Sequence, residues 1–170
     1  GSVTVLDGGA CAVGIESTII DCTRGAPVLL RPGAITADQV LAACGRRLLS
    51  KEELPAHITS GPRASGTLES HYAPSARVRL MDAATLQAAL AGLPVTAESA
   101  QVAVYARHAA RAPASVFVQP MPGSAAATAH ELFAVLRALD ARGVAEIWVE
   151  TPPADSAWDG VRDRLQRAAA

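Results

Sequence analysis

The sequence predicts a parallel three-layer α/β domain over residues 77 to 170, joined by an ordered linker to a smaller piece with a few strands and one helix. Three observations predict the larger domain. Apolar or β-branched runs alternate with segments of helical period, the run at 102–105 is almost wholly apolar, and half of the 170 residues are hydrophobic. Strands that alternate with helices imply right-handed crossovers and therefore a parallel sheet.

The first 45 residues contain only short elements. The expected elements are strands at 3–6, 17–22 and 27–31, the last two forming a hairpin, and a helix at 37–44. Thr36 is suited to cap this helix, Gly45 to end it, and Val40 and Leu41 to form its apolar side. Three short strands and one helix do not close a core. Residues 1–45 are therefore expected to be the end of a larger domain.

Regular alternation of strands and helices begins at residue 77. The expected strands are 77–81, 102–105, 115–119 and 146–150, and the expected helices are 83–93, 124–142 and a last helix from 156 to the end. Asp82 is the expected N-cap of the first helix, and Gly143 follows the second. The residues expected in the helix–sheet core are Leu86, Leu90, Leu93, Leu132, Phe133, Leu136, Leu139, Trp158, Val161, Leu165 and Ala168.

Composition excludes several classes of protein. The net charge is -1 and neither half of the chain is a basic arm, which argues against an electrostatic nucleic-acid footprint. No apolar run reaches the roughly 18 to 20 residues that a membrane span needs, and a soluble cytoplasmic protein is expected. Cys11, Cys22 and Cys44 lack the close pairing of a zinc or redox site and are expected to be small buried residues in a reducing compartment.

A segment without strand or helix period, residues 61–74, separates the two parts. Its prolines and glycines favour ordered turns, while Arg63, His71 and Tyr72 offer side chains that grip a partner or ligand. Flexible spacers are rich in glycine and serine and lack such anchors. We therefore expect a hinge that is also a lid.

Two hydroxyls lie where a segment preceded by a glycine enters the predicted hairpin. Ser17 and Thr18 have hydroxyls that donate to phosphate or carboxylate oxygens, and Gly14 allows backbone N–H groups to approach the same anion. The more common use of such hydroxyls is to satisfy backbone groups at a strand start. A hairpin brings Ser17 and Arg31 to the same end of the sheet, where the Arg31 guanidinium is suited to bidentate binding of a phosphate. The alternative role for Arg31 is a surface ion pair. Glu16 is expected to be solvated.

Other polar residues rank lower as functional candidates. Glu150 and Asp155 flank a proline pair and are expected to be solvated loop charges. Ser124 is explained by ordinary N-capping. His57, His108 and His130 have no neighbours at ligand spacing and are expected at the surface, so the sequence supports no metal site. 

Four separated motifs carry a resemblance to a known family. They are Asp7-Gly8-Gly9, Gly14-Ile15-Glu16-Ser17-Thr18-Ile19-Ile20-Asp21, Leu30-Arg31-Pro32-Gly33-Ala34 and His71-Tyr72-Ala73-Pro74. In this order they resemble the Sua5 branch of the Sua5/YciO/YrdC family, the threonylcarbamoyl-AMP synthases. The stretch that begins with Leu132–Asp140 and continues through Glu150, and the stretch Asp163-Arg164-Leu165, resemble the C-terminal Sua5 domain of that family.

The resemblance implies three parts. Residues 1–45 are expected to be the end of a YrdC-like α+β catalytic domain, residues 46–76 the linker and lid, and residues 77–170 a Rossmann-like C-terminal domain. The implied activity joins L-threonine, bicarbonate or CO2 and ATP, with Mg²⁺ accompanying ATP, into threonylcarbamoyl-AMP for threonylcarbamoylation of adenosine 37 in tRNA. Further implied partners are tRNA or tRNA-modification proteins.

The resemblance also implies roles for particular residues. Ser17, Thr18 and Arg31 are expected to bind ATP and threonine, and the linker residues expected to close over them are Arg63, Ser65, Gly66, His71 and Tyr72. Protection from water suits a carbamate and a mixed anhydride, which both hydrolyse readily.

Two departures from the family's pattern limit the expectation. The family's Lys-x-Arg motif and Ser-x-Asn segment have no counterpart here, so these 170 residues alone are expected to be inactive. The linker reads Ala64-Ser65-Gly66 where relatives usually have Ser-Pro-Gly. The alternative function is a non-catalytic α/β module that binds a ligand or partner through residues 76–170.

Overall fold

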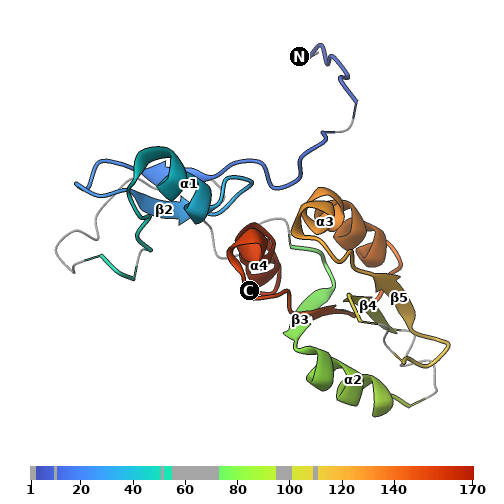
Figure 1. Cartoon of the computed structure of the whole chain (residues 1–170). Helices are drawn as coiled ribbons and strands as arrows, with labels where there is room; N and C mark the ends of the chain where they lie inside the picture. The colour runs from blue at the N-terminus through green and yellow to red at the C-terminus, as the bar shows by residue number, and fades with distance from the viewer. Residues whose placement is uncertain (1–2, 10, 51, 55–72, 95–100, 109–110) are drawn as a thin grey trace.

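The computed structural model describes residues 3–9, 11–50, 52–54, 73–94, 101–108 and 111–170. Within these ranges the chain forms an N-terminal hairpin with one helix and a C-terminal four-stranded sheet covered by helices (Figure 1). None of the helices in the described ranges is both long and apolar enough to span a bilayer.

The N-terminal part is a short antiparallel hairpin. Strand β1 (Ile19–Asp21) pairs with β2 (Val28–Arg31), and the register shifts between Ile19 and Ile20. The predicted strand at 3–6 is wrong, because the chain there forms no ladder and its side chains are exposed, Leu6 by 93%. A β-branched run stays a strand only where a partner satisfies its backbone groups and covers a face.

Helix α1 (Ala37–Cys44) has the predicted bounds. The Thr36 hydroxyl accepts a hydrogen bond from Gln39 N at 3.2 Å while Gln39 Oε1 accepts one from Thr36 N at 2.8 Å, which is a complete capping box. Gly45 ends the helix at a φ of 68°, in the left-handed region that favours glycine. No residue of α1 is buried, however, and Leu41 is 45% exposed. The expected apolar side is therefore uncovered within the described chain.

The C-terminal sheet is parallel throughout. Its strands are β3 (Arg77–Met81), β4 (Val102–Ala106), β5 (Phe117–Pro120) and β6 (Glu146–Glu150), in the order β3-β6-β4-β5. All five residues of β4 are buried, as expected for an interior parallel strand.

Helices cover both faces of the sheet, so the predicted three-layer arrangement is confirmed. Helix α2 (Ala83–Ala91) packs on one face through Leu86 and Leu90. Helices α3 (Ala125–Asp140) and α4 (Asp159–Ala168) pack on the other, and the 3₁₀ turn η3 (Ser156–Trp158) leads into α4 (Figure 1). The predicted N-cap is confirmed, since Asp82 Oδ1 accepts a hydrogen bond from Thr85 N at 2.8 Å.

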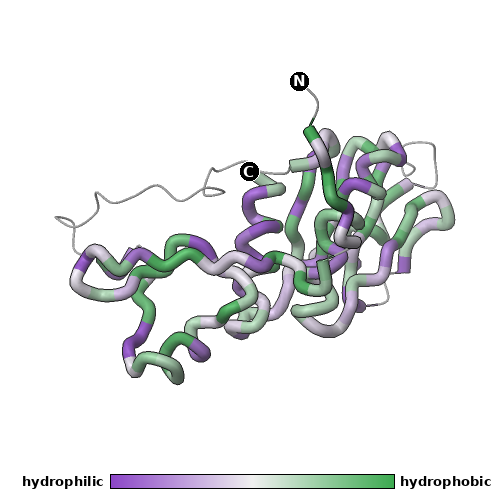
Figure 2. The backbone as a smooth tube through the Cα atoms, turned by 90° about the horizontal axis from the view of Figure 1, so that it is seen from above, coloured by the Kyte–Doolittle hydropathy of each residue, from purple (hydrophilic) through white to green (hydrophobic). Residues whose placement is uncertain are grey.

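Most residues expected in the core are buried, and the cysteines are not. Leu93 and Phe133 are only partly buried, because Leu93 follows the end of α2 and Phe133 lies at the edge of the α3 stripe. Cys11, Cys22 and Cys44 are all exposed, which corrects the expectation of buried thiols. All three cysteines lie in the N-terminal part, where few of the described residues are buried. Figure 2 shows hydrophobic residues, in green, also at the exposed start of this part, below the N label.

Candidate functional site

The hairpin brings the Ser17 segment and Arg31 to one end of the small sheet. Arg31 lies opposite Ile19 in the register, and Ser17 precedes Ile19 by two residues. Gly33 follows Arg31 by two residues and packs on the Ser17 peptide, where a Cβ would lie 2.4 Å from the Ser17 carbonyl carbon. Only glycine permits so close an approach. Ser17 is exposed and Arg31 is half-buried.

The Thr18 hydroxyl ties the two chain segments together beyond the last ladder pair. It donates to the Ile35 carbonyl at 2.9 Å and accepts from the Ile35 N–H at 3.1 Å. Both contacts are of the backbone-satisfying kind that we considered as the alternative to ligand binding. A role for Thr18 in binding stays a prediction, and the structure shows the hydroxyl fixing the loop after Arg31.

Helix α4 adds a cation to the surroundings of the hairpin end. The Arg164 side chain is only 10% exposed and pairs with Asp163. Burial lowers the pKa of Arg164, Asp163 opposes this, and the positive charges of Arg31 and Arg167 lower the pKa further. The pKa of Glu16, an exposed residue as expected, is lowered by a backbone hydrogen bond, by Cys11 and by Arg164. Arg164 of α4 thus interacts electrostatically with Arg31 of the hairpin part, with Asp163 opposing the charge of Arg164, and sequence reasoning missed this interaction because α4 is distant in the chain.

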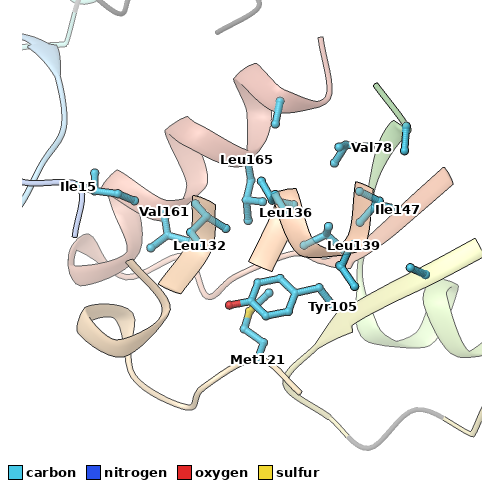
Figure 3. Close-up of a cluster of buried hydrophobic side chains, with 14 of the residues drawn as sticks. Ile15, Val78, Tyr105, Met121, Leu132, Leu136, Leu139, Ile147, Val161 and Leu165 are labelled. Atoms are coloured by element: carbon cyan, nitrogen blue, oxygen red, sulfur yellow. The ribbon is translucent and has the colours of Figure 1, made fainter. Parts of the chain in front are cut away.

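The segment before Ser17 is docked on the C-terminal domain. A Cβ on Gly14 would lie 2.1 Å from the Ala129 carbonyl oxygen, so the Gly14 backbone lies directly on α3. The next side chain, Ile15, is 6% exposed and joins the core between α3 and α4, beside Leu132 and Val161 (Figure 3). Sequence reasoning considered that Gly14 lets backbone N–H groups approach an anion, and the structure shows Gly14 packed on α3.

Ile15 adopts a backbone conformation that its side chain disfavours. Its φ is 54°, and it is the one non-glycine residue with positive φ in the described ranges. For a β-branched residue this conformation costs about 1 to 3 kcal/mol. The burial of the side chain offsets this cost, since a fully buried isoleucine contributes about 1.5 to 3 kcal/mol.

A cavity of about 350 Å³ lies at the junction of the two parts. Its walls are mostly small and apolar, and they come from the hairpin part and from the starts of α3 and α4. The residues that line it include Ala12, Gly14, Ile15, Gly33, Thr36, Gln39, Ala125, Ala129 and Gly160. Because none of the described residues that line it carries a charge, this space suits an apolar group rather than a phosphate.

A buried carboxylate lies at the carboxyl edge of the parallel sheet. Glu150 is 1% exposed, so the expectation of a solvated loop charge is wrong for it, while Asp155 is exposed as expected. Glu150 accepts hydrogen bonds from the backbone N–H groups of Arg107 and His108, both at 2.9 Å, and from Arg107 Nη2 at 2.8 Å. Burial raises its pKa, but His108 and Arg107 lower it more, so the net shift is downward. The carboxylate joins the end of β6 to the loop after β4.

The predicted lid residues lie outside the described residues. These are Arg63, Ser65, Gly66, His71 and Tyr72. Their role in closing a site stays a prediction.

Comparisons with known proteins point to one family. Residues 35–170 match the family described as threonylcarbamoyl-AMP synthase, C-terminal domain. Proteins named threonylcarbamoyl-AMP synthase are similar to the chain: 35% identical over 85 residues in Bacillus subtilis, 34% over 80 in Schizosaccharomyces pombe and 35% over 78 in Pyrococcus abyssi. These matches cover 45 to 46% of this chain and 20 to 23% of the relatives.

Solved structures agree with the sequence matches. The crystal structure of P. abyssi Sua5 complexed with L-threonine superposes with a TM-score of 0.73 and 26% identity over 96% of this chain and 48% of that one. A variant of the same protein, with a histidine and the following tyrosine both changed to alanine, gives a TM-score of 0.72 and 25% identity over 96% and 47% of the two chains. The chain thus covers about half of the solved relative. Because the family match extends over residues 35–170, the chain belongs to the Sua5 family, in which it matches the C-terminal portion of the threonylcarbamoyl-AMP synthases.

Proposed function

We propose that this chain forms the later part of an L-threonylcarbamoyladenylate synthase, which joins L-threonine, bicarbonate or CO2 and ATP for the threonylcarbamoyladenosine modification of tRNA. The observation that carries this proposal is the superposition on a Sua5 solved with L-threonine. It extends over 96% of the chain and so includes the hairpin as well as the parallel sheet.

In this proposal the hairpin end binds the reactants. Arg31 supplies a planar guanidinium for a phosphate or carboxylate, and Ser17 supplies a hydroxyl from the segment that leads into β1. Thr18 acts through its two hydrogen bonds to Ile35, which fix the loop beyond Arg31.

The linker is proposed to close this site. Arg63, Ser65, Gly66, His71 and Tyr72 would cover the reactants and exclude water, because the carbamate and the mixed anhydride hydrolyse readily. The His71-Tyr72 pair has the same residue types, in the same order, as the pair replaced in the P. abyssi Sua5 variant.

Magnesium is proposed to arrive with the ATP phosphates. No group of three His, Cys, Asp or Glu side chains able to hold a metal occurs among the residues that the structure describes. Mg²⁺ usually binds through substrate phosphates and only one or two carboxylates, so a preformed protein cage is not required.

Exposed apolar side chains in the hairpin part support the proposal that the reactant site needs further protein to be complete. The exposed large hydrophobic residues of the described chain all lie in this part; they are Val3, Val5, Leu6, Val13, Ile35 and Leu41. We propose that further protein of the complete synthase covers these side chains. We therefore propose that residues 1–170 alone release no pyrophosphate from ATP with threonine and bicarbonate, and turnover by this chain would contradict that statement.

The test of the binding site uses a complete synthase polypeptide that contains this chain. In calorimetric titrations with ATP, Ser17→Ala and Arg31→Ala are each expected to weaken binding by about tenfold or more, since a hydrogen bond to a charged group contributes about 1.5 to 3 kcal/mol. Arg47→Ala is the matched control, because Arg47 is exposed and pairs only with Glu53 among the contacts described. Unchanged ATP affinity in both variants would favour the non-catalytic module instead.

A further inference from the structure

We propose that Ile15 is a positioning residue, through which helices α3 and α4 hold the Ser17–Thr18 segment in the direction that the proposed reaction needs. The inference rests on the proposed function of Ser17 and Arg31. It gives the C-terminal domain a direct part in shaping the reactant site, which the family match does not assign.

The side chain of Ile15 belongs to the core of the other part of the chain. It enters between α3 and α4, where Leu132 and Val161 lie beside it and Leu136 and Leu165 lie deeper (Figure 3). Its positive φ places the backbone in a conformation that only strong surrounding contacts maintain for a β-branched residue. The turn at Ile15 is thus imposed by the helices and not by the local sequence.

A continuous set of close backbone contacts connects this anchor to the reactant site. Gly14 lies on the Ala129 carbonyl of α3. On α4, a Cβ at Gly160 would lie 3.2 Å from Ile15 Cγ2 and 3.5 Å from the Gly33 carbonyl oxygen. Gly33 in turn packs on the Ser17 peptide. A displacement of Ile15 therefore moves both strands that carry the proposed binding residues.

The cavity at the junction of the two parts lies beside these contacts. The space of about 350 Å³ is lined by residues of the hairpin part and by residues at the starts of α3 and α4. One further link is the hydrogen bond from Ser156 Oγ to Asp38 Oδ2, at 2.9 Å, between η3 and α1. Gly14 and Ile15 pack on α3 and α4 at this junction, together with the contact between Gly33 and Gly160, and we infer that the orientation of Ser17 depends on these contacts.

The first test compares two core variants in the complete synthase. Ile15→Gly removes the anchor and relieves the positive φ, while Leu90→Ala opens the core on the opposite face of the sheet, where Leu90 is 1% exposed. We expect Ile15→Gly to raise the KM for ATP about tenfold, equivalent to about 1.4 kcal/mol. Leu90→Ala should leave the KM unchanged even where it lowers the Tm as much as Ile15→Gly does. Ile15→Val keeps most of the side chain and should restore the KM.

The second test uses the chain itself and needs no activity. Hydrogen exchange of the Ala34 and Ile35 amides reports the loop, since these groups donate to the Glu16 carbonyl and the Thr18 hydroxyl. Exchange at both amides should become about tenfold faster in Ile15→Gly and stay unchanged in Leu90→Ala.

The outcomes separate this inference from the proposed function. If Ser17→Ala raises the KM for ATP but Ile15→Gly changes neither the KM nor the exchange of the two amides, the positioning role is wrong. If neither Ser17→Ala nor Arg31→Ala changes ATP binding while Ile15→Gly still accelerates exchange, the anchor exists and the proposed reactant site is wrong. An equal rise of KM in Leu90→Ala would reduce Ile15 to a contributor to stability and overturn the inference.

Discussion

Glu150 and His108 meet at the carboxyl edge of the parallel sheet, where Glu150 Oε1 lies 2.6 Å from His108 Nδ1. The imidazole is exposed and the carboxylate is buried, so the pair connects solvent to the end of β6. The guanidinium of Arg107 bonds the same carboxylate and lies 5.7 Å from the centre of the Trp158 ring. The carboxylate thus links β6 to the loop after β4, and Arg107 extends this contact to Trp158 at the end of η3.

Replacing Glu150 by alanine should strongly destabilise the C-terminal domain. The change removes the acceptor of two backbone N–H groups and of the Arg107 guanidinium, and breaking a buried pair costs about 3 to 5 kcal/mol. Urea denaturation of the chain measures the loss. The control is Glu53→Ala, since the Arg47–Glu53 pair is exposed and worth about 0 to 1 kcal/mol. Equal losses in the two variants would show that burial of Glu150 adds nothing.

Asp21 should titrate well below an ordinary aspartate. Its pKa is lowered to about 2 by hydrogen bonds from the Thr23 hydroxyl and N–H and by Arg24, which together outweigh burial. The folded-state pKa is depressed, so the stability from Asp21 is fully present above the unfolded value near 3.8 and is lost as the pH falls through about 2.

The Asp21 prediction is checked by NMR titration of its carboxyl carbon. We expect a midpoint near 2 in the native chain and a higher midpoint in Thr23→Ala, which removes the hydroxyl donor. The difference in unfolding free energy between the native chain and Asp21→Asn should also shrink between pH 4 and pH 2. A midpoint close to 3.8 in the native chain would mean that the turn hydrogen bonds do not persist in solution.

Local sequence signals predicted most of the C-terminal fold. The bounds of β3 and β6 follow from short apolar or β-branched runs, and the cap at Asp82 follows from a capping side chain; both signals act within a few residues. The end of α2 was placed two residues too late, because a short apolar tail continues the helical pattern beyond Ala91. The strand predicted at 3–6 failed because its stability depends on a partner that patterning does not report.

The site was less predictable, because its features depend on contacts between distant segments. The sequence predicted a hairpin with Ser17 and Arg31 at the same end of its two strands, because a short loop determines the register. Burial of Glu150 depends on Arg107, over 40 positions away, and the conformation of Ile15 depends on α3 and α4. No pattern within a window of a few residues contains these relationships.

Loss of the α1 cap should unfold this helix locally. Thr36→Ala removes the hydroxyl that accepts from Gln39 N, at a cost of about 1 kcal/mol. Because no residue of α1 is buried, tertiary packing does little to compensate. Hydrogen exchange at Gly45, whose N–H donates to the Leu41 carbonyl at 2.8 Å, should become faster.

The matched control for the α1 cap is Ser124→Ala. Ser124 caps α3 in the same way, through Ala127 N at 3.3 Å, but α3 has four buried residues. Exchange within α3 should therefore stay slow. Equal acceleration in α1 and α3 would show that burial does not decide how much a cap matters in this chain.

Gly14→Ala should detach the hairpin part from the C-terminal domain. The new Cβ would lie 2.1 Å from the Ala129 carbonyl oxygen, and backbone must shift to relieve that clash. Withdrawal of Ile15 from the core then costs about 1.5 to 3 kcal/mol of burial, and NMR contacts between the Ile15 methyl groups and Gly160 should disappear. The control is Gly8→Ala, because no atom lies within 4 Å of a Cβ there. Retention of the Ile15–Gly160 contacts in Gly14→Ala would show that the docking tolerates a side chain at this position, contrary to the geometry of α3.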